Sequence, residues 1–103
     1  MNERRIYICS PCSTEEQRAR LAERIAILCK RIEKKGWVPV WHDADDCLGD
    51  RLEDVTVCHG MLLDVGWRRC QVCLDEKAIA ENHKLTFYHT AEEWKLVKGT
   101  YVI

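Results

Sequence analysis

Two neighbouring acidic residues, Asp75 and Glu76, stand in a segment whose apolar spacing predicts a helix from about residue 73 to residue 83. We expect both in the first turn of that helix, where the helix dipole favours an ionised carboxylate. Such a carboxylate, placed in a pocket, can attack a sugar carbon that is gaining oxocarbenium character. Acidic residues in a first turn more often only stabilise the helix start. On spacing alone, both interpretations stay open.

Cysteine supplies a second kind of chemistry. Four of the seven cysteines form two Cys-x-x-Cys pairs, Cys9 with Cys12 and Cys70 with Cys73. Such pairs are the units of tetrahedral zinc and iron–sulfur sites, and the two pairs could meet at one sheet edge. Free cysteine is also a common core residue, which is the simpler interpretation. A redox role is disfavoured, because we expect no helix to begin inside either motif.

Three loops carry the remaining candidate groups. The first contains Ser10, Pro11 and Ser13 before a helix start, where free backbone N–H groups can hold a phosphate or a carboxylate. The second contains His42, Asp43 and Asp46, either an acid/base or metal cluster or a solvated loop. The third contains Asp64, Gly66 and Trp67, and the indole could stack on a nucleobase or pack in the core.

Alternating strands and helices must position these loops. The expected strands are 5–9, 37–41, 60–65 and 85–89, with Pro39 suited to an edge. The first expected helix starts at a Ser13–Glu16 capping box and ends near Gly36. Two more cover 49–57 and 73–83, and a last short one lies around Trp94, after a Thr90–Glu93 capping pair. This order predicts one α/β domain over residues 1–103, a small doubly wound, Rossmann- or flavodoxin-like parallel sheet of about four strands with flanking helices. Ligands of such sheets bind at the carboxyl ends of the strands.

Composition and charge exclude some classes of binding partner. The formal net charge is -1, with 32% charged and 47% hydrophobic residues. This balance lacks the broad positive field of nucleic-acid and membrane-surface binders, and no apolar run has membrane-spanning length. We therefore expect neither a nucleic-acid polymer nor a membrane as partner. An odd number of cysteines without a leader-like start favours reduced thiols and a cytoplasmic location.

Five segments carry a further pattern: Ile6-Tyr7-Ile8-Cys9-Ser10-Pro11, Gly36-Trp37-Val38-Pro39-Val40, the run from Cys58 to Trp67, the run from Cys73 to Ala80, and Leu85-Thr86-Phe87-Tyr88. In this order they resemble the nucleoside 2-deoxyribosyltransferase-like superfamily. The chain is most similar to the small DUF4406-type proteins of unknown function. The resemblance covers about residues 4 to 94.

The resemblance implies an enzyme that acts on the N-glycosidic bond of a nucleoside or nucleotide, as a deoxyribosyltransferase or an N-glycosidase. Glu76 matches the glutamate nucleophile of that superfamily, and Ser10 and Pro11 match its sugar- or phosphate-binding loop. An acid that handles the base would be Asp43, Asp46 or Asp64. The resemblance further implies a homo-oligomer, a dimer or larger, and no cofactor.

Two departures favour an alternative function. Val72 stands where relatives usually have glycine, and the segment from Asp43 to Val57 is shorter than in the active enzymes. The alternative is a non-catalytic module that binds a nucleotide or assembles with itself. A second alternative is the metal site at the two Cys-x-x-Cys pairs.

Overall fold

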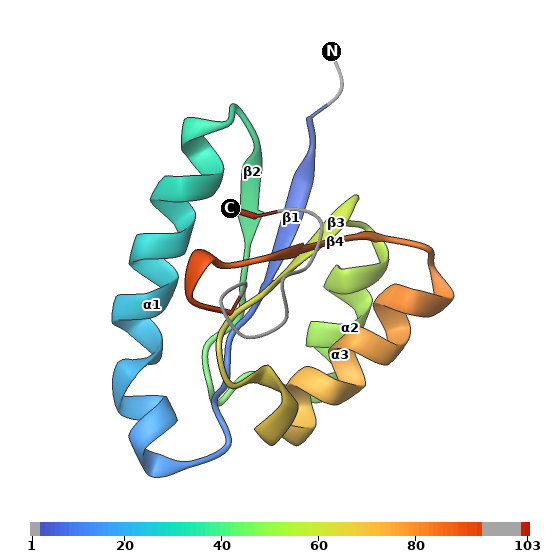
Figure 1. Cartoon of the computed structure of the whole chain (residues 1–103). Helices are drawn as coiled ribbons and strands as arrows, with labels where there is room; N and C mark the ends of the chain where they lie inside the picture. Colours follow the sequence, from blue (N-terminus) through green and yellow to red (C-terminus); the bar gives the residue numbers. More distant parts are fainter. Residues whose placement is uncertain (1–2, 94–101) are drawn as a thin grey trace.

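Four parallel strands form the centre of the molecule, which a computed structural model describes for residues 3–93 and 102–103 (Figure 1). They are β1 (Arg5–Cys9), β2 (Val38–Val40), β3 (Gly60–Leu63) and β4 (Thr86–His89). Their order in the sheet is β2-β1-β3-β4, and every neighbouring pair is parallel. The structure confirms the predicted small doubly wound α/β fold.

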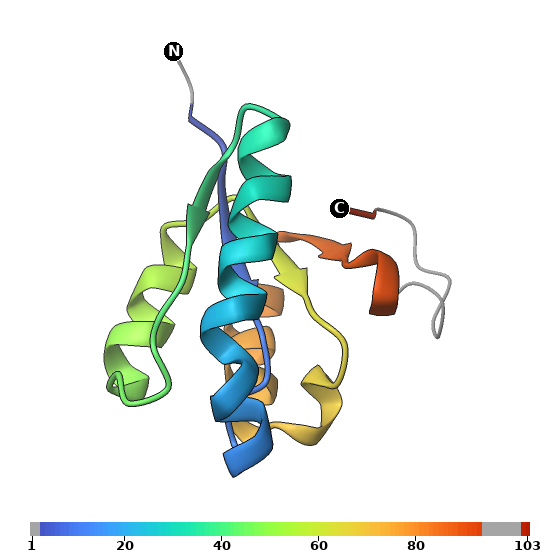
Figure 2. The same ribbon diagram turned by 90° about the vertical axis from the view of Figure 1, so that its left-hand side faces the viewer.

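Helices cover both faces of this sheet (Figures 1 and 2). Helix α1 (Glu15–Lys34) lies on one face, and α2 (Leu48–Thr56) and α3 (Gln71–Asn82) lie on the other. A short 3-10 helix, η1 (Trp67–Arg69), precedes α3. The central strands β1 and β3 are almost entirely buried, as their apolar sequences predict. Strand β2 is at the edge, where Pro39 needs no ladder donor.

The start of α1 lies one residue later than predicted. Thr14, not Ser13, is the N-cap, and Gln17, not Glu16, completes the capping box. Thr14 has the extended backbone that an N-cap requires, and its hydroxyl accepts from the Gln17 N–H at 3.1 Å. The predicted apolar stripe is confirmed, since its members are buried against the sheet: Leu21, Ile25, Leu28 and Ile32.

The start of α3 also differs from the prediction, with more consequence. The helix begins at Gln71, and Cys70 is its extended N-cap. Its first turn therefore holds no acidic residue, so the expected first-turn position of Asp75 and Glu76 is wrong. A helix does begin inside the Cys70-x-x-Cys73 motif, contrary to the expectation. The 3-10 helix η1 ends at Arg69, so Cys70 follows it directly and α3 begins two residues before Cys73.

The segment after β4 follows the predicted capping pattern, since the Glu93 N–H donates to the Thr90 hydroxyl at 3.2 Å. The helix expected around Trp94 lies outside the described residues. Among the described residues, no helix combines the length and apolarity needed to cross a membrane.

Candidate functional site

A pocket opens at the point where the chain reverses its winding direction. Strand β1 leads through α1 to β2, and β3 leads through α3 to β4 on the opposite side, so a crevice forms between the ends of β1 and β3. Its volume is about 140 Å³. It is lined by Ser10, Pro11, Asp64, Val65 and Gly66 from the strand exits and by Gln17, Arg20, Leu21 and Arg24 from α1. Four residues predicted for substrate contact or catalysis therefore meet here.

Asp64 forms the floor of this pocket as a fully partnered ion. Its carboxylate, 1% exposed, accepts from Arg24 at 2.7 and 3.0 Å, from the Ser10 hydroxyl at 2.8 Å and from the Val65 N–H at 2.9 Å. These four hydrogen bonds, two of them from a guanidinium, occupy both oxygens of the carboxylate. Asp64 thereby holds Ser10 and Arg24, two other lining residues of the pocket, in place.

Glu76 lies on the other face of the sheet. Its side chain is 1% exposed and accepts a hydrogen bond from the Tyr7 hydroxyl, while Arg51 lies 3.5 Å from the same carboxylate. Burial raises the pKa of Glu76 to about 7, and the Tyr7 hydrogen bond and the Arg51 charge oppose that rise. Burial and the Glu76 charge also raise the pKa of Tyr7, so its hydroxyl remains a donor. The carboxylate, the phenol and the guanidinium come from α3, β1 and α2.

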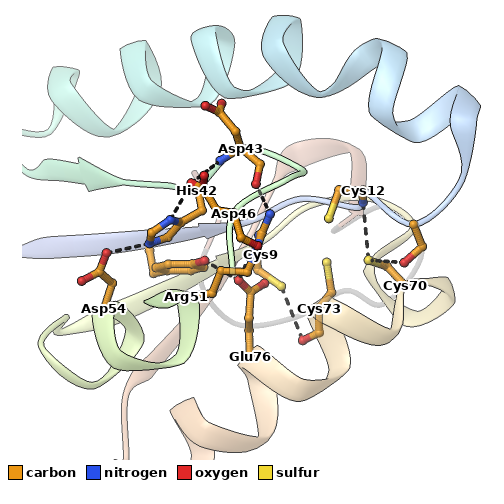
Figure 3. A network of polar contacts seen from close by, with 12 residues as sticks. Cys9, Cys12, His42, Asp43, Asp46, Arg51, Asp54, Cys70, Cys73 and Glu76 are labelled. Atoms are coloured by element: carbon orange, nitrogen blue, oxygen red, sulfur yellow. Dashed lines mark hydrogen bonds and ion pairs between the residues drawn. The ribbon is translucent and has the colours of Figure 1, made fainter. Parts of the chain in front are cut away.

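Arg51 links this carboxylate to the loop that follows β2 (Figure 3). Its guanidinium is buried and donates to the backbone carbonyls of Asp43 and Asp46, the latter at 3.2 Å. The side chain of Asp43 is exposed, and that of Asp46 accepts from His42 and from the Asp43 N–H. Arg51 therefore connects Glu76 to the backbone of the loop, and neither aspartate side chain is directed at Glu76 by these contacts.

His42 lies beside the same network. Its ring nitrogens contact Asp46 at 2.8 Å and Asp54 at 2.6 Å, and its ring centroid is 6.2 Å from that of Tyr7. Burial lowers the pKa of His42, but the hydrogen bonds with Asp46 and Asp54 outweigh it and raise the pKa overall. The sequence predicted the acidic neighbours within the loop. Asp54 was missed because it comes from α2.

The predicted site is thus divided between two faces. Side chains alternate along β1, so that Tyr7 and Cys9 approach Glu76 while Ser10 joins Asp64 in the pocket. Two further predicted contacts lie in neither place. Trp67 is buried and donates to Glu93 at 3.1 Å, and Ser13 donates to the Cys70 sulfur at 3.0 Å.

The two Cys-x-x-Cys pairs meet between β1 and the start of α3, as the topology predicts (Figure 3). Cys9, Cys12, Cys70 and Cys73 are all buried and unoxidised. The sulfur atoms of Cys9 and Cys73 and a carboxylate oxygen of Glu76 lie within 4.8 Å of one another. The Cys12 N–H donates to the Cys70 sulfur at 3.4 Å. A group of thiols therefore adjoins the carboxylate.

Sequence analysis missed Tyr7 and Arg51. Tyr7 stands in the middle of a strand that the sequence predicts to be buried, and a buried tyrosine hydroxyl needs a hydrogen-bond partner. That requirement is the signal that could have identified Tyr7. Arg51 lies four residues before Val55 on the buried stripe of α2, where an arginine requires a counter-ion. Neither signal identifies the partner, because Glu76 is distant in sequence.

Comparisons of this chain with protein-family models, with curated proteins and with solved structures each found no match. The fold is that of a small doubly wound α/β domain. Its distinguishing feature is a buried carboxylate held by a tyrosine and an arginine beside four cysteines.

Proposed function

We propose that this domain cleaves or transfers the N-glycosidic bond of a nucleoside or nucleotide, with Glu76 as the carboxylate nucleophile. The observation that carries the proposal is the way Glu76 is held: Tyr7 donates to it and Arg51 pairs with it. The resemblance to the nucleoside 2-deoxyribosyltransferase-like superfamily, which assigns the nucleophile to the same residue, supports it.

The energetics of the buried pair favour a role beyond folding. Taking a carboxylate and a guanidinium out of water costs several kcal/mol for each ion, and well-packed apolar residues often replace such a pair without loss of stability. A core of this size gains little from Glu76 and Arg51 as packing units. A carboxylate nucleophile must stabilise the positive charge that develops on the sugar in the transition state. A negative charge that is already oriented in a site without water does this well.

The chemistry follows from the contacts. One oxygen of Glu76 attacks the anomeric carbon while the bond to the base breaks, and the base leaves with the bonding electron pair. The His42 imidazolium, beside Tyr7 and paired with Asp46 and Asp54, supplies the proton to the departing base. Water or a second base then attacks the glycosyl ester and regenerates the carboxylate. Tyr7 orients Glu76 throughout.

Substrate access requires residues 43–46 of the loop to move, while His42 keeps its contact with Asp54 of α2. Glu76 is covered, and Arg51 holds that loop through the carbonyls of Asp43 and Asp46. Opening breaks hydrogen bonds to backbone carbonyls and leaves the Tyr7–Glu76 contact intact. We expect substrate to replace the loop carbonyls as the partner of the guanidinium.

The test is release of free base. The protein is incubated with each of the common deoxynucleosides and deoxynucleoside monophosphates, and the base is quantified by chromatography. Glu76→Gln should abolish release, whereas Asp75→Asn should not, because Asp75 is only half-buried on the same helix and its side chain accepts from Gln71, outside the Glu76 network. Lack of release by folded wild-type protein, or equal release by Glu76→Gln, would contradict the proposal.

The pocket at Ser10 and Pro11 favours a second candidate, a non-catalytic binding module. Its volume of about 140 Å³ is below the roughly 300–1,000 Å³ of drug-sized ligand sites, so it suits one phosphate or carboxylate group better than a whole nucleoside. Arg20 provides a charge at its rim. A thermal shift with deoxyribose 5-phosphate that is kept in Glu76→Gln, without base release, would favour binding.

We also propose that the chain forms a homo-oligomer. Enzymes of the resembling superfamily complete their sites with a neighbouring subunit, and this chain exposes Trp41 near the loop that covers Glu76. Sedimentation velocity tests this separately, and a monomer at all concentrations would contradict it.

A further inference from the structure

We propose that the two Cys-x-x-Cys pairs form a single tetrahedral zinc site with Cys9, Cys12, Cys70 and Cys73 as its ligands. The inference does not depend on the proposed glycosidic chemistry. It rests on the meeting of two pairs that are 58 residues apart from Cys12 to Cys70.

Hydrogen bonds connect the two pairs around the start of α3. The Cys12 N–H donates to the Cys70 sulfur at 3.4 Å, and the Cys9 thiol donates to the Cys73 carbonyl oxygen at 3.7 Å. The sulfur atoms of Cys9 and Cys73 already lie within 4.8 Å of each other. Zinc–sulfur bonds of about 2.3 Å in a tetrahedron place the sulfur atoms about 3.8 Å apart. Side-chain rotations of the cysteines can close the remaining difference, because two of the ligands flank a loop.

Polar groups converge on one sulfur as they do on a metal-bound thiolate. The Cys70 sulfur accepts from the Cys12 N–H at 3.4 Å and from the Ser13 hydroxyl at 3.0 Å. Such outer-shell donors orient ligands and stabilise their charge. A cysteine that only fills a core needs none of these donors.

Positive charge is available to offset a site of four thiolates and one zinc ion, which carries two negative charges. Cys70 is the N-cap of α3 and Cys73 lies in its first turn, so the free N–H groups of the helix face the cluster. The buried guanidinium of Arg51 lies 3.5 Å from Glu76, whose carboxylate oxygen adjoins the sulfur atoms of Cys9 and Cys73. The protons that zinc displaces from the thiols pass to solvent.

Glu76 is a less suitable ligand than the fourth cysteine. Its oxygen lies near Cys9 and Cys73, but its carboxylate is already satisfied by Tyr7 and Arg51. Zinc also binds a complete set of thiolates in structural sites. A catalytic disulfide is disfavoured because Cys70 and Cys73 are fully buried, which denies access to a partner thiol.

The experiment is metal analysis of the full chain, expressed with added zinc and purified without chelator. We expect about one zinc ion per chain, and exchange for Co²⁺ should give intense thiolate-to-metal charge-transfer absorption with tetrahedral d–d bands. Zinc below a tenth of an ion per chain, with no charge-transfer band on Co²⁺ titration of reduced protein, would overturn the proposal. So would a mass two daltons lower, which marks a disulfide among these cysteines.

Variants locate the ion. Cys12→Ser and Cys70→Ser should each lower zinc content at least tenfold, whereas Cys29→Ser and Cys47→Ser, outside the cluster, should keep it. The Co²⁺ spectrum of the wild type stays decisive even where a serine variant fails to fold. Loss of zinc in Glu76→Gln but not in Cys12→Ser would overturn the four-cysteine assignment. Base release is measured separately, so failure of one proposal leaves the other testable.

Discussion

The hydroxyl of Tyr7 donates a hydrogen bond to the carboxylate of Glu76, across 69 positions of sequence. The contact joins the central strand β1 to α3 inside the core. Since both side chains are buried, neither can exchange its partner for water without opening the structure. This pair therefore fixes the orientation of the one carboxylate on which the proposed chemistry depends.

Tyr7→Phe should raise the pKa of Glu76, because the hydrogen bond from Tyr7 stabilises the ionised form. A hydrogen bond to a charged group contributes about 1.5–3 kcal/mol, so unfolding at pH 8 should become easier by a similar amount. Carboxyl carbon chemical shifts followed against pH measure the first effect, and urea denaturation measures the second. Tyr88→Phe, whose hydroxyl accepts from Arg4, is the control and should leave the Glu76 titration unchanged.

Arg51→Met should destabilise the protein by about 3–5 kcal/mol at pH 8, because it leaves the Glu76 carboxylate buried without a counter-ion. The carbonyls of Asp43 and Asp46 lose their donor in the same variant. Adding Glu76→Gln should recover part of the loss, since the uncompensated charge is removed. Urea denaturation of the two single variants and the double variant measures the coupling. Strictly additive losses would show that the two side chains do not interact.

Two arginines of α1 line the same pocket and should differ in their effect on stability. Arg24→Met removes the cation from Asp64, whose carboxylate is buried, and should cost about 2 kcal/mol or more. Arg20→Met breaks an exposed pair with Glu16 and should cost about 0.5 kcal/mol or less. Chemical denaturation under identical conditions compares them. Equal losses would mean that burial of Asp64 does not strengthen its ion pair.

Glu92 should make stability depend on pH in acid. Hydrogen bonds from Arg31 and Arg24 lower the pKa of Glu92 to about 2, although partial burial opposes this. Its ordinary pKa in the unfolded chain is higher, so its contribution is present above pH 4.5 and is lost as the pH falls towards 2. Because Glu92 is partly exposed, we expect about 1 kcal/mol. Glu92→Gln should reduce the change of the urea denaturation midpoint with pH between these values. Glu33→Gln is the control variant and should leave that change as in the wild type.

The sequence predicts the order of elements well because each element carries a local signal. Apolar runs mark β1 and β3, and Pro39 predicts an edge for β2. The meeting of the two Cys-x-x-Cys pairs follows from the strand order and is confirmed. The first residue of each helix is harder to predict. The exact N-cap of α1 depends on the backbone conformation at Thr14, and the start of α3 depends on η1, which no periodic pattern indicates.

The candidate site is harder to predict because it depends on the direction of side chains. Ser10 and Cys9 are adjacent in sequence, yet one joins Asp64 and the other approaches Glu76. The register of a strand decides this, and a shift by one residue would exchange the two faces. The pairing of Arg51 with Glu76 is likewise a product of the packing of α2 against α3.

Gly60 should tolerate no side chain, because its backbone lies where β3 passes close to its neighbours. A Cβ there would come within 2.8 Å of Cε2 of Tyr88 and 3.0 Å of the Thr86 carbonyl oxygen, and the latter cannot move without disturbing β4. Gly60→Ala should therefore destabilise by about 1–3 kcal/mol. Gly49→Ala, in helix α2 with only the Cys47 sulfur at 3.7 Å, should instead stabilise by up to about 1 kcal/mol. Thermal denaturation of the two variants measures the loss of stability in Gly60→Ala and the gain in Gly49→Ala. A neutral Gly60→Ala would show that β3 and β4 can separate more readily than their burial indicates.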